Sequence, residues 1–291
     1  MKFSVFSVSM PEYDIEQTVK TLKELGYDGV EWRVAPAPPL EKPEDYTYSG
    51  RYWSFNQSNI DVTKVEELAP SVKDLCNKYD LEICSLTTYL GPWDVQDIER
   101  VLRAANILNC KNIRLFPPTY DESENFRKLF DRTVEQIKVL EKLAARYNVR
   151  INFEIHMGNI IPSASAAYRL VCNFNPDLIG IIFDPGNMVY EGFENYRMGI
   201  ELLGEYLAHV HVKNSMWALS ETTKAGVKIW KPTWANMKEG FADITKLIQI
   251  LYEIGYDKFV SVEDFSNNDD TYTKLKSNLE FLKSIKAPGK L

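Results

Sequence analysis

Short apolar runs, rich in β-branched and aromatic residues, alternate along the chain with longer stretches in which apolar residues recur at helical spacing. The short runs are typical of buried strands, and the longer stretches are typical of amphipathic helices. We expect strands at residues 3–8, 29–32, 82–86, 112–116, 150–155, 179–183, 207–212 and 259–263. We expect helices at residues 14–25, 61–79, 95–108, 124–147, 163–173, 196–203, 244–254 and 270–285.

Eight strands, each followed by helical sequence, indicate repeated parallel β-α-β units. The chain length of 291 residues fits a (β/α)8 barrel, which takes about 250 residues plus insertions. A doubly wound open sheet is the competing fold. It usually has fewer strands and a glycine-rich first turn, whereas the first turn here is Ser7-Val8-Ser9-Met10-Pro11. The sequence therefore predicts one TIM barrel domain over residues 1–291, with long loops after the second and seventh strands.

Four successive predicted strands become polar at their C-terminal ends, where each carries a residue that can bind a metal. These residues are Glu154 in NFEIH, Asp184 in IFDPGN, His211 in HVHVKN and Glu263 in SVEDF. Active sites of (β/α)8 barrels are built at this end of the strands. A mixed carboxylate and imidazole set suits one divalent cation, and we expect Mn²⁺ ahead of Mg²⁺, Co²⁺ or Zn²⁺.

Strand parity places the other polar residues relative to these four, because side chains two apart point to the same face. If Glu154 and His211 face the barrel interior, His156 projects above the rim and His209 lies one layer deeper. We expect His156 to contact substrate or to support a ligand, and His209 to support the ligand above it. Lys213 shares the parity of His211, so it is a candidate for substrate binding or for a solvated strand-end lysine.

Across nearly its whole length the chain resembles the xylose-isomerase-like TIM barrels, which include sugar isomerases, ketose 3-epimerases, inosose dehydratases and AP endonucleases of the second family. The resemblance is carried by GVEW at residues 29–32, by FEIH, FDPGN and HVHVKN, and by EGFAD running into IGYDKFVSVED. It implies the same four metal ligands, with Glu154 and Glu263 also acting as the acid/base pair of the ketose epimerases.

Two departures from the epimerase pattern bear on the substrate. Asn187 stands where a substrate-contacting histidine is common, and the arginine that follows the strand-seven histidine is missing. We keep Asn187 as a candidate substrate contact. Glu31 is a second candidate, with pairing to Arg33 or another basic residue as the alternative.

The function expected from this pattern is a metal-dependent sugar isomerase or epimerase that removes a proton next to a metal-bound carbonyl to give an enediolate. A dehydratase or lyase acting on a keto-sugar, keto-glycoside or keto-polyol uses the same first step and is the main alternative. A non-catalytic sugar-binding barrel is a third hypothesis. An AP endonuclease is disfavoured, because those barrels hold three zincs with many histidines and this chain has three histidines in all.

Composition narrows the partners and the compartment. The net charge of −7 argues against nucleic acid, which is bound through clustered lysine and arginine. No apolar run reaches the roughly 18 residues of a membrane helix, and the first residues do not resemble a signal peptide, so we expect a cytoplasmic protein. The four cysteines have no paired spacing and are expected to be buried thiols.

Two long loops are rich in aromatic residues, at residues 34–60 and 214–240. Loops of this length are usually lids or binding loops. Their aromatic side chains suit the apolar faces of sugar rings, and they equally suit a subunit interface. We expect a small sugar or sugar derivative as the ligand and keep a homo-oligomer as an open possibility.

Overall fold

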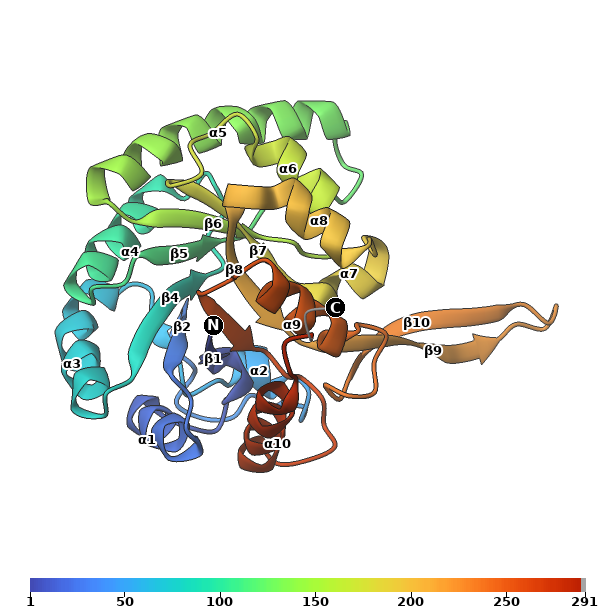
Figure 1. The fold of residues 1–291 in the computed structure, drawn as a ribbon, viewed down its shortest axis with the longest axis horizontal. Coiled ribbons are helices and arrows are strands. Elements are labelled where there is room, and N and C mark those ends of the chain that lie inside the picture. The colour runs from blue at the N-terminus through green and yellow to red at the C-terminus, as the bar shows by residue number, and fades with distance from the viewer. Residues whose placement is uncertain (289–291) are drawn as a thin grey trace.

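A closed barrel of eight parallel strands, surrounded by helices, forms the centre of the molecule (Figure 1). The structure is a computed structural model that describes residues 1–288. In order around the barrel the strands are β1 (Lys2–Phe6), β2 (Gly29–Ala35), β4 (Glu82–Thr88), β5 (Asn112–Leu115), β6 (Arg150–Glu154), β7 (Ile179–Phe183), β8 (Leu207–Val212) and β11 (Phe259–Val262). Strand β1 pairs in parallel with both β2 and β11, which closes the ring. The predicted (β/α)8 barrel is confirmed.

Eight helices on the outside of the barrel correspond to the predicted helices. They are α1 (Ile15–Leu25), α3 (Val65–Lys78), α4 (Val95–Ile107), α5 (Phe126–Tyr147), α6 (Ala164–Val171), α8 (Tyr196–Leu203), α9 (Ile244–Glu253) and α10 (Thr271–Ser284). The largest shift in a boundary is at α3, which begins at Val65 rather than at residue 61. The reason is that Ile60 and Asp61 instead form a short strand, β3, which pairs with β2.

Local sequence explains how α1 begins and ends. The Asp14 side chain accepts a hydrogen bond from the backbone N–H of Gln17, and the Gln17 side chain accepts one from the backbone N–H of Asp14. This capping box satisfies two N–H groups that the first helical turn leaves free. At the other end Gly26 has a φ of 86°, a left-handed conformation that ends the helix at low steric cost.

The barrel strands alternate between apolar residues that face the helices and polar residues that face the barrel axis. Outward residues such as Val30, Ile151 and Val210 belong to the hydrophobic core between strands and helices. Buried polar residues contact one another inside the barrel: Glu31, Thr87, Arg114, Glu154, His209 and His211. Such an interior is stable only when its polar groups are paired with one another.

Several short elements lie in the connections. Helix α2 (Arg51–Ser54) lies in the long loop after β2, and 3-10 turns form at Ser7–Ser9 and Gly204–Tyr206. Helix α7 (Pro185–Glu191), which the sequence pattern does not predict, begins directly after β7.

The long loop predicted after the seventh barrel strand contains an antiparallel hairpin, β9 (Asn214–Thr222) and β10 (Lys228–Ala235). The hairpin extends away from the barrel as a two-stranded arm (Figure 1). Its outer part is exposed on both faces, so it lacks the buried apolar face by which strands are recognised in a sequence.

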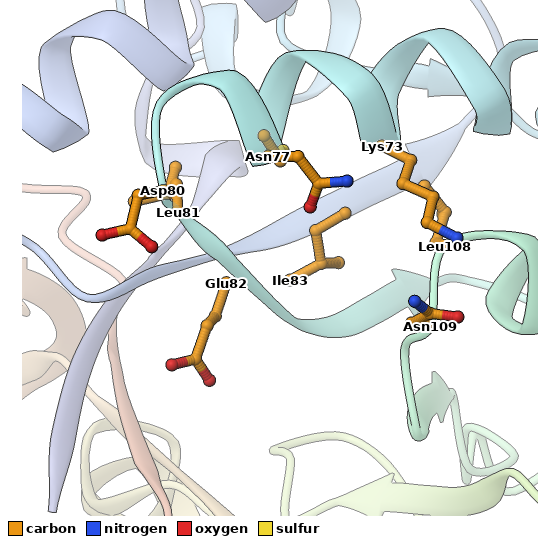
Figure 2. Close-up of a pocket in the computed structure, with 9 residues that line it drawn as sticks. Lys73, Asn77, Asp80, Leu81, Glu82, Ile83, Leu108 and Asn109 are labelled. Atoms are coloured by element: carbon orange, nitrogen blue, oxygen red, sulfur yellow. The ribbon is translucent and has the colours of Figure 1, made fainter.

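The two ends of the barrel differ in what they carry. The C-terminal strand ends hold the predicted site residues. A hollow of about 260 Å³ lies at the other end, beside the start of β4, and is lined by residues such as Lys73, Asp80 and Asn109 (Figure 2). None of the predicted site residues lines that hollow. Within residues 1–288 no helix is both long enough and apolar enough to cross a membrane.

The capping box predicts a measurable contribution to stability. Asp14→Ala should lower the free energy of unfolding by about 1 kcal/mol, because the first turn of α1 loses its side-chain acceptor. Asp14→Asn keeps an acceptor of the same shape and should stay close to wild type. Urea unfolding of the three proteins measures the difference, and equal losses in both variants would contradict a capping role for Asp14.

Candidate metal centre

The four predicted ligands lie together at the C-terminal ends of their strands. Glu154 is the last residue of β6, Asp184 follows β7, His211 lies in β8 and Glu263 follows β11. Each offers a ligand atom, and these atoms all lie within 4.8 Å of one another. All four side chains are buried. Four residues that span more than a hundred positions in the sequence therefore form one cluster.

The imidazole of His211 lies between the Glu31 carboxylate on one side and the three carboxylates of the cluster on the other. Its Nδ1 lies 3.0 Å from Glu154 Oε1, 3.6 Å from Asp184 Oδ2 and 3.8 Å from Glu263 Oε2. Its Nε2 lies 3.0 Å from Glu31 Oε1. A carboxylate that accepts the Nε2 proton leaves the Nδ1 lone pair free for a cation, which is the usual support of a metal-binding histidine.

Glu31 lies beneath His211. It does not line the cavity of about 380 Å³ that opens at the mouth of the barrel. Its carboxylate accepts a hydrogen bond from Thr87 and lies 2.9 Å from Nε2 of His209. Burial raises the pKa of Glu31, but His211 and His209 outweigh burial and hold that pKa well below its ordinary value. The substrate contact predicted for Glu31 remains a prediction, and these contacts favour support of His211 instead. His209 lies one layer below His211, as the parity argument expects.

Asp184 is presented by the sequence Asp-Pro-Gly-Asn. Its Oδ1 accepts a hydrogen bond from the backbone N–H of Asn187 at 3.0 Å and so caps α7, with Pro185 in the first turn. Its Oδ2 is buried and has no hydrogen-bond partner among the described residues. The ammonium of Lys213 lies 3.0 Å from this oxygen, and a buried carboxylate oxygen without a hydrogen bond needs such a cation or a metal ion beside it. Oδ1 of Asp184 therefore caps the helix, and Oδ2 faces the cluster, where a metal ion could bind it.

Lys213 brings a positive charge to the cluster. The side chain is only 3% exposed, and its Nζ lies 3.0 Å from Asp184 Oδ2 and makes an ion pair with Glu263. Burial lowers the pKa of Lys213, but Asp184, Glu263 and Glu154 outweigh burial and raise it. Gly186 provides the room, because a Cβ there would lie 2.4 Å from Lys213 Cγ.

Arg114, in β5, is a site residue that the sequence pattern does not identify. Its guanidinium makes a buried ion pair with Glu154 and donates two hydrogen bonds to the carbonyl oxygen of Thr88. Burial raises the pKa of Glu154, but Arg114 and His211 lower it by more than burial raises it. The pKa of Glu154 therefore lies well below its ordinary value. An arginine inside the apolar run NIRLF is the signal that could have revealed it, since a buried charge needs a partner.

Two other predicted residues surround the cluster. The Asn187 side chain donates hydrogen bonds to Glu154 Oε1 at 3.2 Å and to the carbonyl oxygen of Ile155 at 3.0 Å. His156 lies at the rim, where its ring packs edge-on against Phe116 at 4.7 Å between centroids. Burial lowers the pKa of His156. His156 lines the cavity at the mouth of the barrel, and Asn187 does not.

The balance of buried charge fits a divalent cation. Glu31, Glu154, Asp184 and Glu263 carry four negative charges when ionised, and Arg114 and Lys213 supply two positive charges. With both histidines neutral, which is the form of His211 that binds a metal, an excess of two negative charges remains, and one divalent cation would neutralise it. Burial lowers the pKa of His211, but the surrounding carboxylates outweigh burial and raise that pKa, so protonation of His211 offsets one of these charges when no cation is bound. Asp184 Oδ2, which has no hydrogen bond among the described residues, and His211 Nδ1, which lies 3.6 Å from it, are oriented toward one point in agreement with this count. The donor set of three carboxylates and one imidazole suits such an ion.

A cavity of about 380 Å³ opens directly onto this cluster. Glu154, Lys213, Glu263 and Arg114 form its polar floor. Its walls are largely aromatic: Trp53, Tyr89, Phe116, Trp234 and Phe265, together with His156 and Met157. The two long aromatic loops thus each contribute to the cavity, through Trp53 and Trp234. Trp217 and Trp230, from the second loop, lie outside it.

The fold and the site together define a TIM barrel with a carboxylate and histidine cluster at its C-terminal mouth. Residues 19–285 match the model of the xylose isomerase-like TIM barrel family. The chain belongs to this family, and the resemblance seen in the sequence is confirmed.

Among curated proteins, the chain is similar to an inosose dehydratase from Bacillus licheniformis. The two are 24% identical over 149 residues, which cover 50% of this chain and 48% of that protein. A second inosose dehydratase, from Clostridium botulinum, is 25% identical over 161 residues, or 50% of this chain and 51% of that protein. The chain spans about half the length of these curated relatives.

Solved structures share the fold over nearly the whole chain. A 3-keto-D-glucoside 4-epimerase from E. coli has a TM-score of 0.72 and 17% identity, covering 98% of this chain and 99% of that chain. A probable 3-DHS dehydratase from Bacillus anthracis has a TM-score of 0.73 and 17% identity, covering 98% and 100%. The IolI protein, whose structure holds a zinc atom, has a TM-score of 0.68 and 16% identity, covering 98% of each chain. At these identities the similarity concerns the fold.

The charge count predicts how the protein responds to a cation. Mn²⁺ or Zn²⁺ at about one hundred times its dissociation constant should stabilise the wild type by about 2.7 kcal/mol. Asp184→Asn should remove this response, because it takes away one charged ligand oxygen of the cluster. Without metal the variant should be as stable as wild type or more stable, since the excess of buried negative charge is reduced.

Thermal unfolding with and without each cation, together with metal analysis of the purified protein, measures this response. The remote substitution Asp14→Asn is the matched control and should keep the full shift. An Asp184→Asn variant that still binds and responds to the cation would rule out the four-residue site.

Proposed function

We propose that this chain is a divalent-metal-dependent enzyme that removes the proton next to the ketone of a sugar or cyclic polyol, and that the reaction proceeds to loss of water. The observation that carries the proposal is the buried cluster of four candidate ligands, two of which, Glu154 and Glu263, line a cavity walled by aromatic side chains. A bound divalent cation would supply a Lewis acid that grips the ketone oxygen and acidifies the neighbouring C–H.

The contacts favour Glu263 over Glu154 as the base. Both oxygens of Glu154 are engaged, because Oε2 accepts from Arg114 and Oε1 accepts from Asn187 and lies beside His211. These partners stabilise the ionised form and make Glu154 a weak proton acceptor. Glu263 receives a hydrogen bond from Lys213 on Oε2, and burial raises its pKa above the ordinary value. Glu154 then acts as a metal ligand fixed by Arg114 and Asn187, and Glu263 acts as the base that accepts the proton from the substrate.

A single base suits elimination better than epimerisation. Glu263 takes the proton from carbon, and the hydroxyl on the next carbon leaves from the same face and takes that proton as water. The product is an unsaturated ketone, and no oxidant or reductant is consumed. The similarity to inosose dehydratases supports this outcome. Epimerisation needs a second group on the opposite face, and Glu154 is the residue available for that role.

The isomerase or epimerase predicted from the sequence is therefore the second candidate. The fold shared with a 3-keto-D-glucoside 4-epimerase is the observation in its favour. It predicts a product with inverted stereochemistry that retains every hydroxyl and gains solvent deuterium at one carbon. A barrel that only binds a sugar predicts a bound ligand without exchange or turnover.

The cavity favours an uncharged substrate about the size of one sugar ring. Its two cations, Arg114 and Lys213, are already paired with Glu154 and with Glu263, so neither is free to bind a phosphate. Aromatic walls such as Trp53 and Trp234 suit the C–H faces of a sugar ring. The volume of about 380 Å³ lies at the lower end of small-molecule sites. We infer a neutral keto-sugar or keto-polyol rather than a phosphate ester.

The choice of base is tested by two matched substitutions. Glu263→Gln should lower kcat for dehydration about 100- to 10,000-fold, the effect of removing a general base. Glu154→Gln keeps an oxygen ligand and should cost less in kcat, with part of its effect appearing as weaker metal binding. Metal content of both variants, measured beside the kinetics, separates the two causes. A larger loss of kcat in Glu154→Gln at full metal occupancy would reverse the assignment.

Product analysis decides between the two candidate reactions. With an inosose or a related keto-polyol, the wild type should give a product lighter by one water, which absorbs in the ultraviolet as a conjugated ketone. Mass spectrometry and NMR in deuterated buffer give the answer from one incubation. An epimer of unchanged mass, apart from one deuterium, would support the second candidate and overturn dehydration.

A further inference from the structure

The hairpin β9–β10 is the part of the molecule that the proposed reaction does not explain. Its base is anchored to the barrel. The indole N–H of Trp217 donates a hydrogen bond to the carbonyl oxygen of Val189, and Trp234 packs against Phe265 and Tyr190. Beyond the base, residues 218–231 are exposed except for half-buried Ile229, and the arm stands clear of the barrel (Figure 1). An isolated two-stranded hairpin is at best marginally stable in water.

One face of this arm is apolar from its base to Trp230. Trp230 lies directly opposite Leu219, and the next pair on the same face joins Pro232 to Trp217. Trp230 is 51% exposed and Leu219 is 48% exposed. The same parity leads back to Trp234 in the cavity wall. The arm therefore presents to solvent an apolar strip that begins at the active-site cavity, which is typical of a surface that another molecule covers.

The charge of the arm indicates what that molecule is. Between Asn214 and Ala235 the chain carries three exposed lysines, Lys224, Lys228 and Lys231, against one carboxylate, Glu221, a net charge of +2. The whole chain has a net charge of −7, so the rest of the chain carries −9. A basic arm on an acidic barrel is complementary to the barrel of a second copy of the same chain.

The size of the arm also favours a two-fold dimer of this chain. Strands rise about 3.4 Å per residue and lie about 4.8 Å apart, so the exposed part of the arm is roughly 20 Å long and 10 Å wide. One such arm offers only a fraction of the roughly 800 Å² per partner found in a stable interface. In a two-fold dimer each copy both gives an arm and receives one, which doubles the contact.

We propose that the hairpin β9–β10 is a dimerisation arm, and that its apolar strip and lysines pack against the acidic barrel of a second copy. The arm begins one residue after Lys213 and ends next to Trp234, so docking also holds one wall of the cavity in place. The dimer is independent of which reaction the site performs.

The proposal is tested by the mass of the full-length protein in solution. Sedimentation velocity over a range of concentrations should show a dimer for the wild type. The double substitution Trp230→Glu and Leu219→Glu should raise the dissociation constant at least about 30-fold, as for loss of a central apolar contact. Val139→Glu is the matched control, because Val139 is an equally exposed apolar residue on α5 and should leave the dimer intact.

Two further measurements address the charge of the arm and the integrity of the barrel. Lys228→Gln with Lys231→Gln should weaken the dimer, and added salt should weaken the wild-type dimer more than this variant. Circular dichroism and thermal unfolding of the arm variants check that the barrel stays folded. A wild type that is monomeric at all concentrations, or a dimer that survives Trp230→Glu with Leu219→Glu, would overturn the proposal.

Discussion

The constraint on which this structure depends is the burial of several carboxylates inside the barrel. Each needs a partner, because an unpaired buried charge is far more costly than a paired one. Glu154 pairs with Arg114, Glu31 lies against two histidines, and Glu263 pairs with Lys213. Asp184 Oδ2 is fully buried and has no hydrogen bond among the described residues, and the Lys213 ammonium lies beside it at 3.0 Å. The site for a cation is the part of this network that the protein leaves incomplete.

The same constraint explains local features around the mouth. Asp184 can face the cluster because its other oxygen caps α7, and the proline that follows begins that helix. Gly186 lacks a side chain because Lys213 passes through the space that a Cβ would take. The polar interior is tolerated because the outward faces of the same strands supply the hydrophobic core against the helices. Stability and chemistry are thus divided between the two faces of each strand.

Much of the fold was readable from the sequence because burial leaves a periodic pattern. Strands β7 and β8 coincide with their predicted ranges, since both are apolar and bounded by polar turns. The hairpin β9–β10 was not readable, because its strands are exposed on both faces and mix lysine, threonine and tryptophan. Helix α7 was also missed. Seven residues that begin with Pro-Gly carry too little periodicity to indicate a helix.

The candidate site likewise has features that the sequence determines and features that only the tertiary structure determines. The sequence alone determined which four strands end in residues that can bind a metal, and strand parity separated His211 from His209, because both follow from order and spacing along the chain. Only the tertiary structure decided the partners of these residues. Glu31 meets His211 across 180 positions, and Arg114 meets Glu154 across 40, because closure of the barrel brings their strands around one axis. Charge pairing inside a closed barrel depends on distance through space, which local periodicity does not record.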